Sequence, residues 1–159
     1  MLHRFLLICF VWFGSGHCDD VSECFDGWVA YEGSCYLFGH DAVPFAEAKH
    51  FCEQHHQSYL VNIGSADENN FLKAYLRGLK HKVWWMGLSD HEKEGEWKWV
   101  NTDTVAEFTD WDPSQPDPSE EDCGVFWLAF DFRWGDVPCT SNFTPVCEMG
   151  TQINTDIIG

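Results

Sequence analysis

Cysteine spacing constrains the fold of this chain more than any other feature of the sequence. The chain has 159 residues and eight cysteines. Six of them are separated by 10, 16, 70, 15 and 7 residues: Cys24, Cys35, Cys52, Cys123, Cys139 and Cys147. In an exported chain such a set indicates disulfides, not metal ligands or redox centres. The mixture of short and long gaps predicts a loop-rich domain whose ends are held together by three disulfides.

The first residues have the pattern of an export signal. Arg4 supplies a positive charge, residues 5–13 form an unbroken apolar run of nine, and Gly14-Ser15-Gly16 offers the small residues that signal peptidase needs. A membrane-spanning helix takes roughly 20 apolar residues. We therefore expect a secreted chain with no membrane span, in which residues 1–16 are the signal peptide.

The cleavage site decides the fate of one further cysteine. Cleavage after Gly16 leaves Cys18 on an N-terminal arm of residues 17–23, outside the set of six, whereas cleavage after Cys18 removes it. A retained Cys18 is either a remnant of the signal, capped after secretion, or the partner in an interchain disulfide. The second interpretation predicts a covalent homodimer.

Charge restricts the partners that the chain can have. Lysine and arginine number 9 against 26 acidic residues, which gives a formal net charge of −17. Nucleic acid and anionic membranes are poor partners for such a chain, because a polyanion would be repelled. Cations, cationic partners and neutral ligands remain. For most of the acids, a solvating surface is a sufficient explanation.

Residue patterns predict a mixed α+β domain. Pro44 suits a helix start, and Phe45, Ala48 and Cys52 then share one helical face. The segment Ser65-Ala66-Asp67-Glu68 is a capping box that opens a second helix. This helix should continue to about residue 76 and direct four residues to the core: Phe71, Leu72, Tyr75 and Leu76.

Short apolar and aromatic runs predict the strands, at residues 27–31, 34–38, 59–63, 83–88, 96–100, 124–130 and 145–149. Four tryptophans within these runs are expected to pack in the core: Trp84, Trp85, Trp97 and Trp99. Residues 101–122 contain three prolines and have no regular period. A loop of that length inside a compact domain is usually functional. The polar residues 150–159 are expected to be a disordered tail.

Several motifs, in a fixed order, resemble the C-type lectin-like domain family over residues 24–149. They are Cys24, Trp28 and Cys35-Tyr36; Phe45 to Cys52; Trp85-Met86-Gly87-Leu88; Glu96-Trp97-Lys98-Trp99; Phe108-Thr109-Asp110-Trp111; Gln115-Pro116-Asp117; Glu121-Asp122-Cys123; and Trp134-Gly135-Asp136. The resemblance implies two helices packed on two small antiparallel sheets, with a long calcium- and sugar-binding loop. It also implies three disulfides: Cys24–Cys35, Cys52–Cys147 and Cys123–Cys139. Secreted single-domain lectins of the perlucin type look similar in size and cysteine count.

The resemblance also implies a calcium site in the long loop. Its ligands would be Gln115, Asp117, Glu121 and Asp136, and two neighbouring hydroxyls of a sugar would complete the coordination shell. Calcium takes six to eight oxygen ligands, which carboxylates and side-chain amides can supply. In the family Pro116 is cis and orients its neighbours towards the ion, Trp134 forms the wall behind Asp136, and the Gln-Pro-Asp form leans towards galactose-type sugars.

The chain departs from the family pattern at Gly135, where the family commonly has an asparagine that binds the ion and a sugar hydroxyl. We expect this departure to weaken the site. We also expect Gly135→Asn to strengthen sugar binding, with Gly135 on a solvent-facing loop. In addition, Asp117 is followed by Pro118-Ser119-Glu120, without the aromatic residue on which galactose usually stacks in the family.

A second, auxiliary calcium position is implied at Asp90, Glu94 and Asp122, and Glu121 could bridge both sites. The alternative is that residues 89–95 form an exposed, charged turn. Asn142-Phe143-Thr144 is an N-glycosylation sequon, which makes Asn142 a candidate glycan acceptor.

Two adjacent histidines raise the question of a zinc site. His55 and His56 lie close to Cys52, but Cys52 is better used in a disulfide, so solvent exposure explains the histidines better than zinc does. The sequence also lacks a nucleophile motif, a phosphate loop and a His-Glu-x-x-His motif, so no enzyme is expected.

Two functions remain. The first is a secreted, calcium-dependent carbohydrate-binding protein with glycan partners. The second is an acidic extracellular or shell-matrix protein of the perlucin type, which binds calcium mineral or another protein.

Overall fold

The computed structural model describes residues 24–117 and 121–150. The expected signal peptide, the arm with Cys18 and residues 151–159 of the expected tail lie outside the described residues. Residues 24–117 and 121–150 contain two α-helices, α1 (Phe45–Gln54) and α2 (Ala66–Leu76), and a short 3-10 helix, η1 (Leu128–Phe130). In the part of the chain that the structure describes, no helix is long and apolar enough to cross a membrane.

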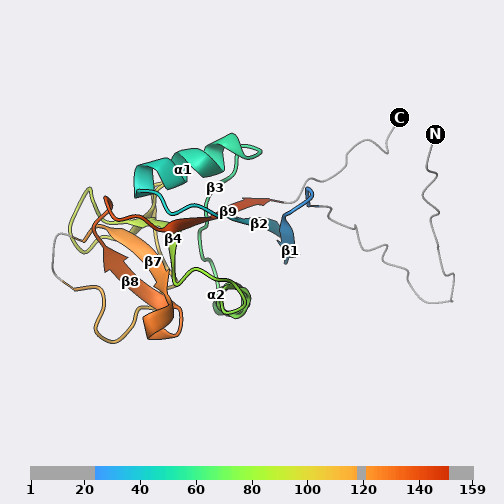
Figure 1. Ribbon diagram of the computed structural model, residues 1–159. Coiled ribbons are helices and arrows are strands. Elements are labelled where there is room, and N and C mark those ends of the chain that lie inside the picture. The colour runs from blue at the N-terminus through green and yellow to red at the C-terminus, as the bar shows by residue number, and fades with distance from the viewer. Residues whose placement is uncertain (1–23, 118–120, 151–159) are drawn as a thin grey trace, which may run out of the picture.

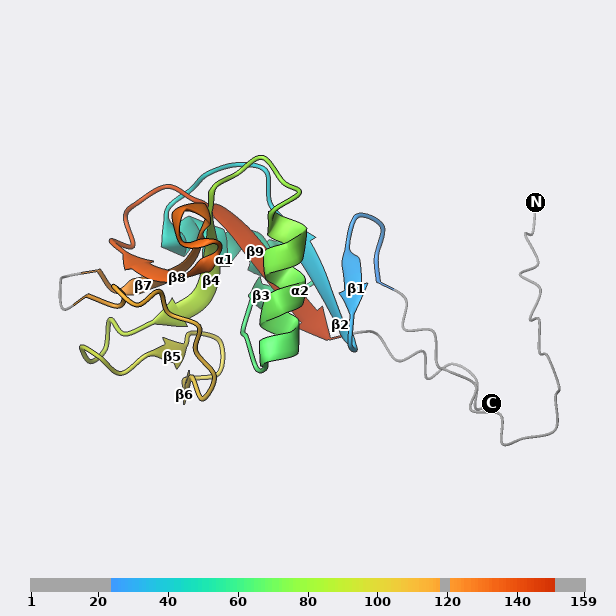
Figure 2. The same ribbon diagram turned by 90° about the horizontal axis from the view of Figure 1, so that it is seen from below.

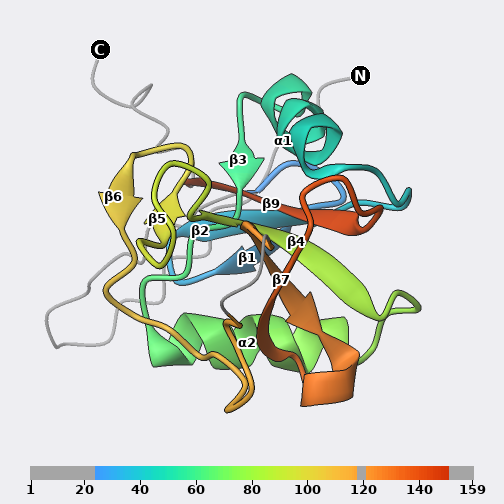
Figure 3. The same ribbon diagram turned by 90° about the vertical axis from the view of Figure 1, so that its left-hand side faces the viewer.

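The strands form two antiparallel groups that are joined in the middle. The first contains β1 (Val29–Tyr31), β2 (Ser34–Phe38), β3 (Tyr59–Leu60) and β9 (Thr144–Gly150), and the second contains β4 (Val83–Ser89), β5 (Lys98–Trp99), β6 (Thr104–Val105), β7 (Cys123–Trp127) and β8 (Arg133–Val137). A short parallel pairing of β4 with β9 connects them. Helices α1 and α2 lie on opposite sides of these strands (Figures 1 and 3). The predicted α+β fold is confirmed.

The two helices begin where the sequence predicts. Pro44 is the N-cap residue of α1. At the start of α2, Ser65 Oγ accepts a hydrogen bond from the Glu68 amide at 3.2 Å. The reciprocal half of the capping box is displaced by one residue, because the Glu68 carboxylate accepts from Gly64 N, at 2.8 Å. The expected core face is wrong at Tyr75, whose side chain is 37% exposed.

Four predicted strands are shorter in the structure, and the first of them, predicted at residues 27–31, begins only at Val29. Residues 59–63 and 96–100 retain only the two-residue strands β3 and β5, although Val61 N and Val100 N still donate to β9 and β4, the strands with which β3 and β5 pair. The strand predicted at 124–130 ends at Trp127. Asp131 and Phe132 then adopt positive φ angles of 53° and 58°, which turns the chain back into β8, a strand absent from the predicted set.

The described residues contain three disulfides, and all three pairings implied by the family resemblance are confirmed: Cys24–Cys35, Cys52–Cys147, which joins α1 to β9, and Cys123–Cys139. Each contributes roughly 2–4 kcal/mol, mainly by restricting the unfolded chain. The four tryptophans expected in the core are buried, with exposed fractions of 8% or less. The second strand group, with the long loop, lies at the end of the molecule away from β1 (Figure 2).

Candidate calcium site

Three acidic side chains meet where the long loop passes the end of β8. Asp117, Glu121 and Asp136 each offer a carboxylate oxygen, and these oxygens lie within 4.8 Å of one another. The fourth predicted ligand joins them, because Gln115 Oε1 accepts a hydrogen bond from the Asp136 amide at 3.2 Å. The structure therefore brings together all four residues predicted for the primary site.

Backbone hydrogen bonds to β8 position the loop. Trp134 N donates to Asp110 O and Asp112 N donates to Trp134 O, both at 2.9 Å. Gln115 N then donates to Asp112 O at 2.8 Å, and the Gln115–Pro116 peptide bond is cis, as the resemblance implied. The base of the loop thus runs beside Trp134, and the Gln115-to-Asp117 segment arrives next to Asp136.

A polar network from α2 anchors the same loop from its other side. Asp110 Oδ2 accepts hydrogen bonds from Asn69 Nδ2 at 2.8 Å and from Lys73 Nζ at 2.7 Å. Asn69 Oδ1 accepts from Trp134 Nε1 at 2.9 Å. Asn69 and Lys73 are only 2% and 8% exposed. The sequence analysis did not predict this network. The pattern that could have indicated it is the spacing of Asn69 and Lys73, which are four residues apart and therefore lie on one face of a helix.

The Asp136 carboxylate is buried without being fully satisfied. Its residue is 1% exposed, and Oδ1 accepts a hydrogen bond from Asp117 N at 3.4 Å. Oδ2 has no hydrogen-bond partner among the described residues. Burial raises the pKa of Asp136 to about 6, and the charges of Asp117 and Glu121 add to the increase, while backbone hydrogen bonds oppose it.

This arrangement fits a hard cation. A buried carboxylate oxygen without a partner costs roughly 1–3 kcal/mol or more, and the repulsion between three neighbouring carboxylates adds to that cost. A divalent cation would remove both penalties. The four residues offer carboxylate and side-chain amide oxygens, and these are the ligand atoms that calcium prefers.

Gly135 is not on a solvent-facing loop, so that expectation is wrong. It is a buried residue of β8, where an added Cβ would lie 3.1 Å from Phe130 Cε2 and 3.4 Å from Trp127 Cε3. Next to it, Trp134 is fully buried and packs edge-on against Trp99, Phe108 and Trp111. The Gly135 position is therefore closed by aromatic rings.

The residues expected at the auxiliary position make other contacts. Asp90 Oδ2 accepts a hydrogen bond from Gly95 N at 2.8 Å, which closes the turn, while Asp90 Oδ1 is buried without a partner among the described residues. Asp122 Oδ2 lies 3.0 Å from His91 Nδ1, and this hydrogen bond raises the pKa of the histidine. Glu94 belongs to the same segment. None of these acids is in the cluster around Asp136.

The remaining candidate residues fall outside this site. Cys52 is in a disulfide, His55 Nδ1 lies 2.7 Å from Phe51 O, and the His56 ring stacks on Phe25 with centroids 3.6 Å apart. Asn142 is exposed, as a glycan acceptor must be.

Comparison with known proteins identifies the family. The family model of the lectin C-type domain matches residues 41–149. A perlucin-like protein from Mytilus galloprovincialis is 34% identical over 140 residues, which cover 86% of this chain and 89% of that protein. An alpha-N-acetylgalactosamine-specific lectin from Patiria pectinifera is 34% identical over 133 residues, covering 78% of this chain and 79% of the relative. Several vertebrate relatives are longer, and the chain spans less than two thirds of each.

The fold comparison agrees with the sequence comparison. The carbohydrate-recognition domain of the mouse scavenger receptor C-type lectin superposes with a TM-score of 0.73 at 31% identity, covering 82% of this chain and all of that domain. Residues 41–149, which the family model matches, contain both helices, the long loop and the three residues of the acidic cluster. The chain therefore belongs to the C-type lectin family.

Proposed function

We propose that this chain is a secreted, calcium-dependent carbohydrate-binding protein whose ion is held by Gln115, Asp117, Glu121 and Asp136. The observation that carries the proposal is the buried Asp136 carboxylate, whose Oδ2 has no hydrogen-bond partner in the described residues. Two further carboxylates converge on the same point. A cation is the kind of ligand that such a group requires. Binding, without catalysis, is the function that follows.

Each residue has a distinct part in this proposal. Asp136 and Asp117 are held together by the Asp117 amide, and Gln115 fixes the Asp136 backbone, so the oxygens are placed before a ligand arrives. Calcium, when bound, offers open positions to neighbouring hydroxyls of a sugar. Carboxylate oxygens around it can accept hydrogen bonds from those hydroxyls. The Gln115-Pro116-Asp117 motif and the specificity in the name of the Patiria pectinifera relative favour galactose-type sugars.

Binding of the ion should depend on pH. The pKa of Asp136 is raised to about 6, so a proton competes with a cation for this carboxylate in mildly acidic solution. Calcium affinity, and sugar binding with it, should therefore fall as the pH is lowered through about 6.

A glycan array tests the proposal most broadly. The secreted protein is applied at neutral pH with millimolar calcium, and again with a chelator. Retention on galactose- or N-acetylgalactosamine-terminated glycans that disappears with chelator supports the proposal. Binding that is unchanged by chelator, or no binding to any glycan, contradicts it.

A second candidate function is an acidic extracellular or shell-matrix protein of the perlucin type. It is favoured by the net charge of −17 and by the likeness to the perlucin-like protein across 89% of that relative's length. The closed Gly135 position, without the family's asparagine, also favours it. Adsorption to calcium carbonate in the absence of any glycan binding would make this function the better one.

Three finer features remain proposals. The first is an auxiliary ion near Asp90, Glu94 and Asp122, and the second is a glycan on Asn142. The third is a homodimer linked through Cys18, which lies outside the described residues. N-terminal sequencing and intact mass with and without reductant decide the dimer, since a mature chain that starts at Asp19 excludes it.

A further inference from the structure

A second concave site lies apart from the acidic cluster. It is a cleft of about 520 Å³ between the first turn of α1 and the β5 segment. None of the four proposed calcium ligands lines it. Cavities of about 300–1,000 Å³ are the size that small-molecule ligands occupy. The cleft is therefore large enough to hold a small-molecule ligand.

Apolar groups form the floor of this cleft. Phe45 and Ala46 contribute from α1, Trp99 and Val100 from the opposite side, and the Cys123–Cys139 disulfide lies between them. This floor is fixed by covalent and hydrogen bonds. Phe45 N donates to Cys139 O at 3.0 Å, which ties the start of α1 to the disulfide. Because the floor is held in place, an apolar ligand would meet a preformed surface.

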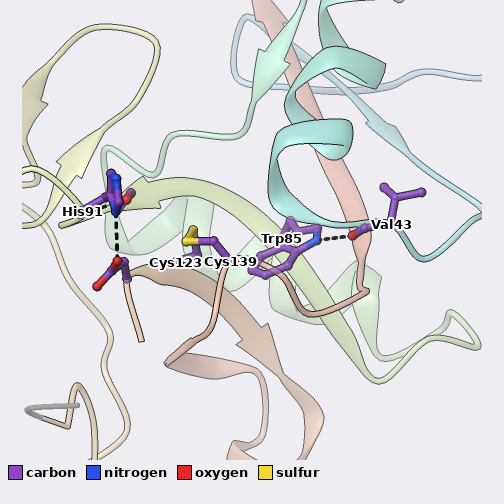
Figure 4. The surroundings of a disulfide bond; sticks show 7 residues. Val43, Trp85, His91, Cys123 and Cys139 are labelled. Carbon is purple, nitrogen blue, oxygen red and sulfur yellow. Dashed lines mark hydrogen bonds and ion pairs between the residues drawn. A yellow bond between two sulfur atoms is a disulfide. The ribbon is translucent and has the colours of Figure 1, made fainter. Parts of the chain in front are cut away.

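The residues behind the floor hold it in position. Trp85 Nε1 donates to Val43 O at 2.8 Å and so fixes the segment that leads into α1 (Figure 4). The Phe45 ring packs edge-on against Trp85, with ring centroids 5.4 Å apart. Figure 4 shows the Cys123–Cys139 disulfide between Trp85 and His91.

One rim of the cleft carries more negative than positive charge. Lys98 Nζ lies 3.0 Å from Asp103, 3.2 Å from Glu92 and 3.7 Å from Glu96. Lys93 also pairs with Glu96, at 2.8 Å. Three carboxylates thus share two lysines, and the side chains of Glu92 and Asp103 remain 73% and 74% exposed. This rim has unused capacity to accept hydrogen bonds from a cation.

The cationic groups on the remaining rim are already paired. His91 lies 3.0 Å from the Asp122 carboxylate (Figure 4), and Lys49 Nζ lies 3.9 Å from Glu53 on the next turn of α1. Both partners are carboxylates outside the lining of the cleft. The charge around the cleft, within a chain of net charge −17, favours a cationic ligand over an anionic one.

We propose that this cleft binds a small amphipathic amine, with its apolar part on the disulfide, Phe45 and Trp99 and its ammonium group at Glu92 and Asp103. The ligand class follows from an apolar floor beside an acidic rim. This assignment does not rest on the proposed calcium site.

A charge-matched ligand series tests the proposal. Titrations of the intact secreted protein, followed by protein-detected NMR in the presence of chelator, compare 2-phenylethylamine, 2-phenylethanol and 3-phenylpropionate. The three share an aromatic ring and differ in head-group charge. The amine should bind with an affinity at least about tenfold that of the carboxylate. Shifted signals should map to the first turn of α1 and to β5, away from Asp136.

Two variants test the contributions of the acidic rim and of the apolar floor to binding separately. Glu92→Gln with Asp103→Asn should remove the preference for the amine, while Ala46→Trp, at an exposed α1 position that lines the cleft, should block all three probes. Equal affinity for all three probes in the parent protein would overturn the proposal, as would the absence of binding at millimolar amine. An amine preference that survives the rim variant would overturn the assigned position of the ammonium group.

Discussion

Asp136 and Glu148 are both buried acids with raised pKa values, but their carboxylate oxygens differ in the hydrogen bonds that they accept. The pKa of Glu148 is raised to about 7, by burial first and then by the charge of Glu68. Its two oxygens are both satisfied, since Ser34 Oγ donates to Oε1 at 2.8 Å and Asn62 N donates to Oε2 at 3.1 Å. Asp136 has a partner for Oδ1 but none for Oδ2 among the described residues.

The difference separates a structural acid from a ligand-binding one. Around Glu148 the bonds connect elements of the fold: Glu148 lies in β9, and the neighbouring Glu68 of α2 accepts a hydrogen bond from Tyr36 in β2, at 2.7 Å. Around Asp136 the bonds instead orient a group of carboxylates and leave one oxygen open. We infer that the first region stabilises the fold and that the second is placed for a cation.

The largest effect on the free energy of unfolding is expected from the titration of Glu148. Its folded-state pKa of about 7 lies above the unfolded value near 4.5, so the folded protein holds the extra proton between these values. Stability should therefore fall as pH rises from about 4.5 to 7, by about 3 kcal/mol for this group. Urea unfolding of the parent and of Glu148→Gln, with chelator, measures the difference at each pH. Parallel pH profiles for the two proteins would show that Glu148 is not the group responsible.

Breaking the ion pair between Lys73 of α2 and Asp110 should lower the free energy of unfolding by a smaller amount. Lys73→Met leaves Asp110 without its ion-pair partner, next to the loop that carries Gln115 and Asp117. Because Asp110 retains some exposure, we expect a cost of about 2 kcal/mol, below that of a fully buried pair. Calcium affinity should fall as well. The matched control is Arg77→Met, which breaks the exposed Arg77–Asp131 pair and should cost less than about 1 kcal/mol. Equal losses in the two variants would contradict the anchor role of Lys73.

The smallest effect is expected at Gly135. Gly135→Asn must displace the Phe130 ring, and such overpacking costs on the order of 1 kcal/mol. In the double variant Gly135→Asn/Phe130→Ala the ring is absent, so the asparagine should cost nothing further. Thermal unfolding of the double variant and of Phe130→Ala alone measures this difference. Additive effects of the two substitutions would mean that the ring does not close the position.

Local patterns were sufficient for the parts of the fold that depend on local chemistry. Pro44 and Ser65 mark both helix starts correctly, and the cysteine spacing predicted three disulfides. Family motifs led to the correct disulfide partners and to the four residues that meet at Asp136. These features depend on residue type and spacing, which a sequence displays directly.

Features that depend on burial could not be obtained in this way. Strand β8 was missed because Gly135 and Asp136 interrupt its apolar pattern, although both are buried. The Asn69–Lys73–Asp110 network requires a helix and a loop about 40 residues apart to meet. The burial of Glu148 and the aromatic rings over Gly135 are likewise set by tertiary packing.

Calcium-dependent stabilisation of the parent protein and of Asp136→Asn tests the central claim most directly. Calorimetry at neutral pH, with and without millimolar calcium, compares both with Asp131→Asn, an equal charge change at a 76% exposed acid. A ligand at 100 times its dissociation constant stabilises the folded state by about 2.7 kcal/mol. We predict that calcium raises the unfolding temperature of the parent and of Asp131→Asn, and that Asp136→Asn loses most of the rise. An unchanged calcium response in Asp136→Asn, or none in the parent, would contradict the account.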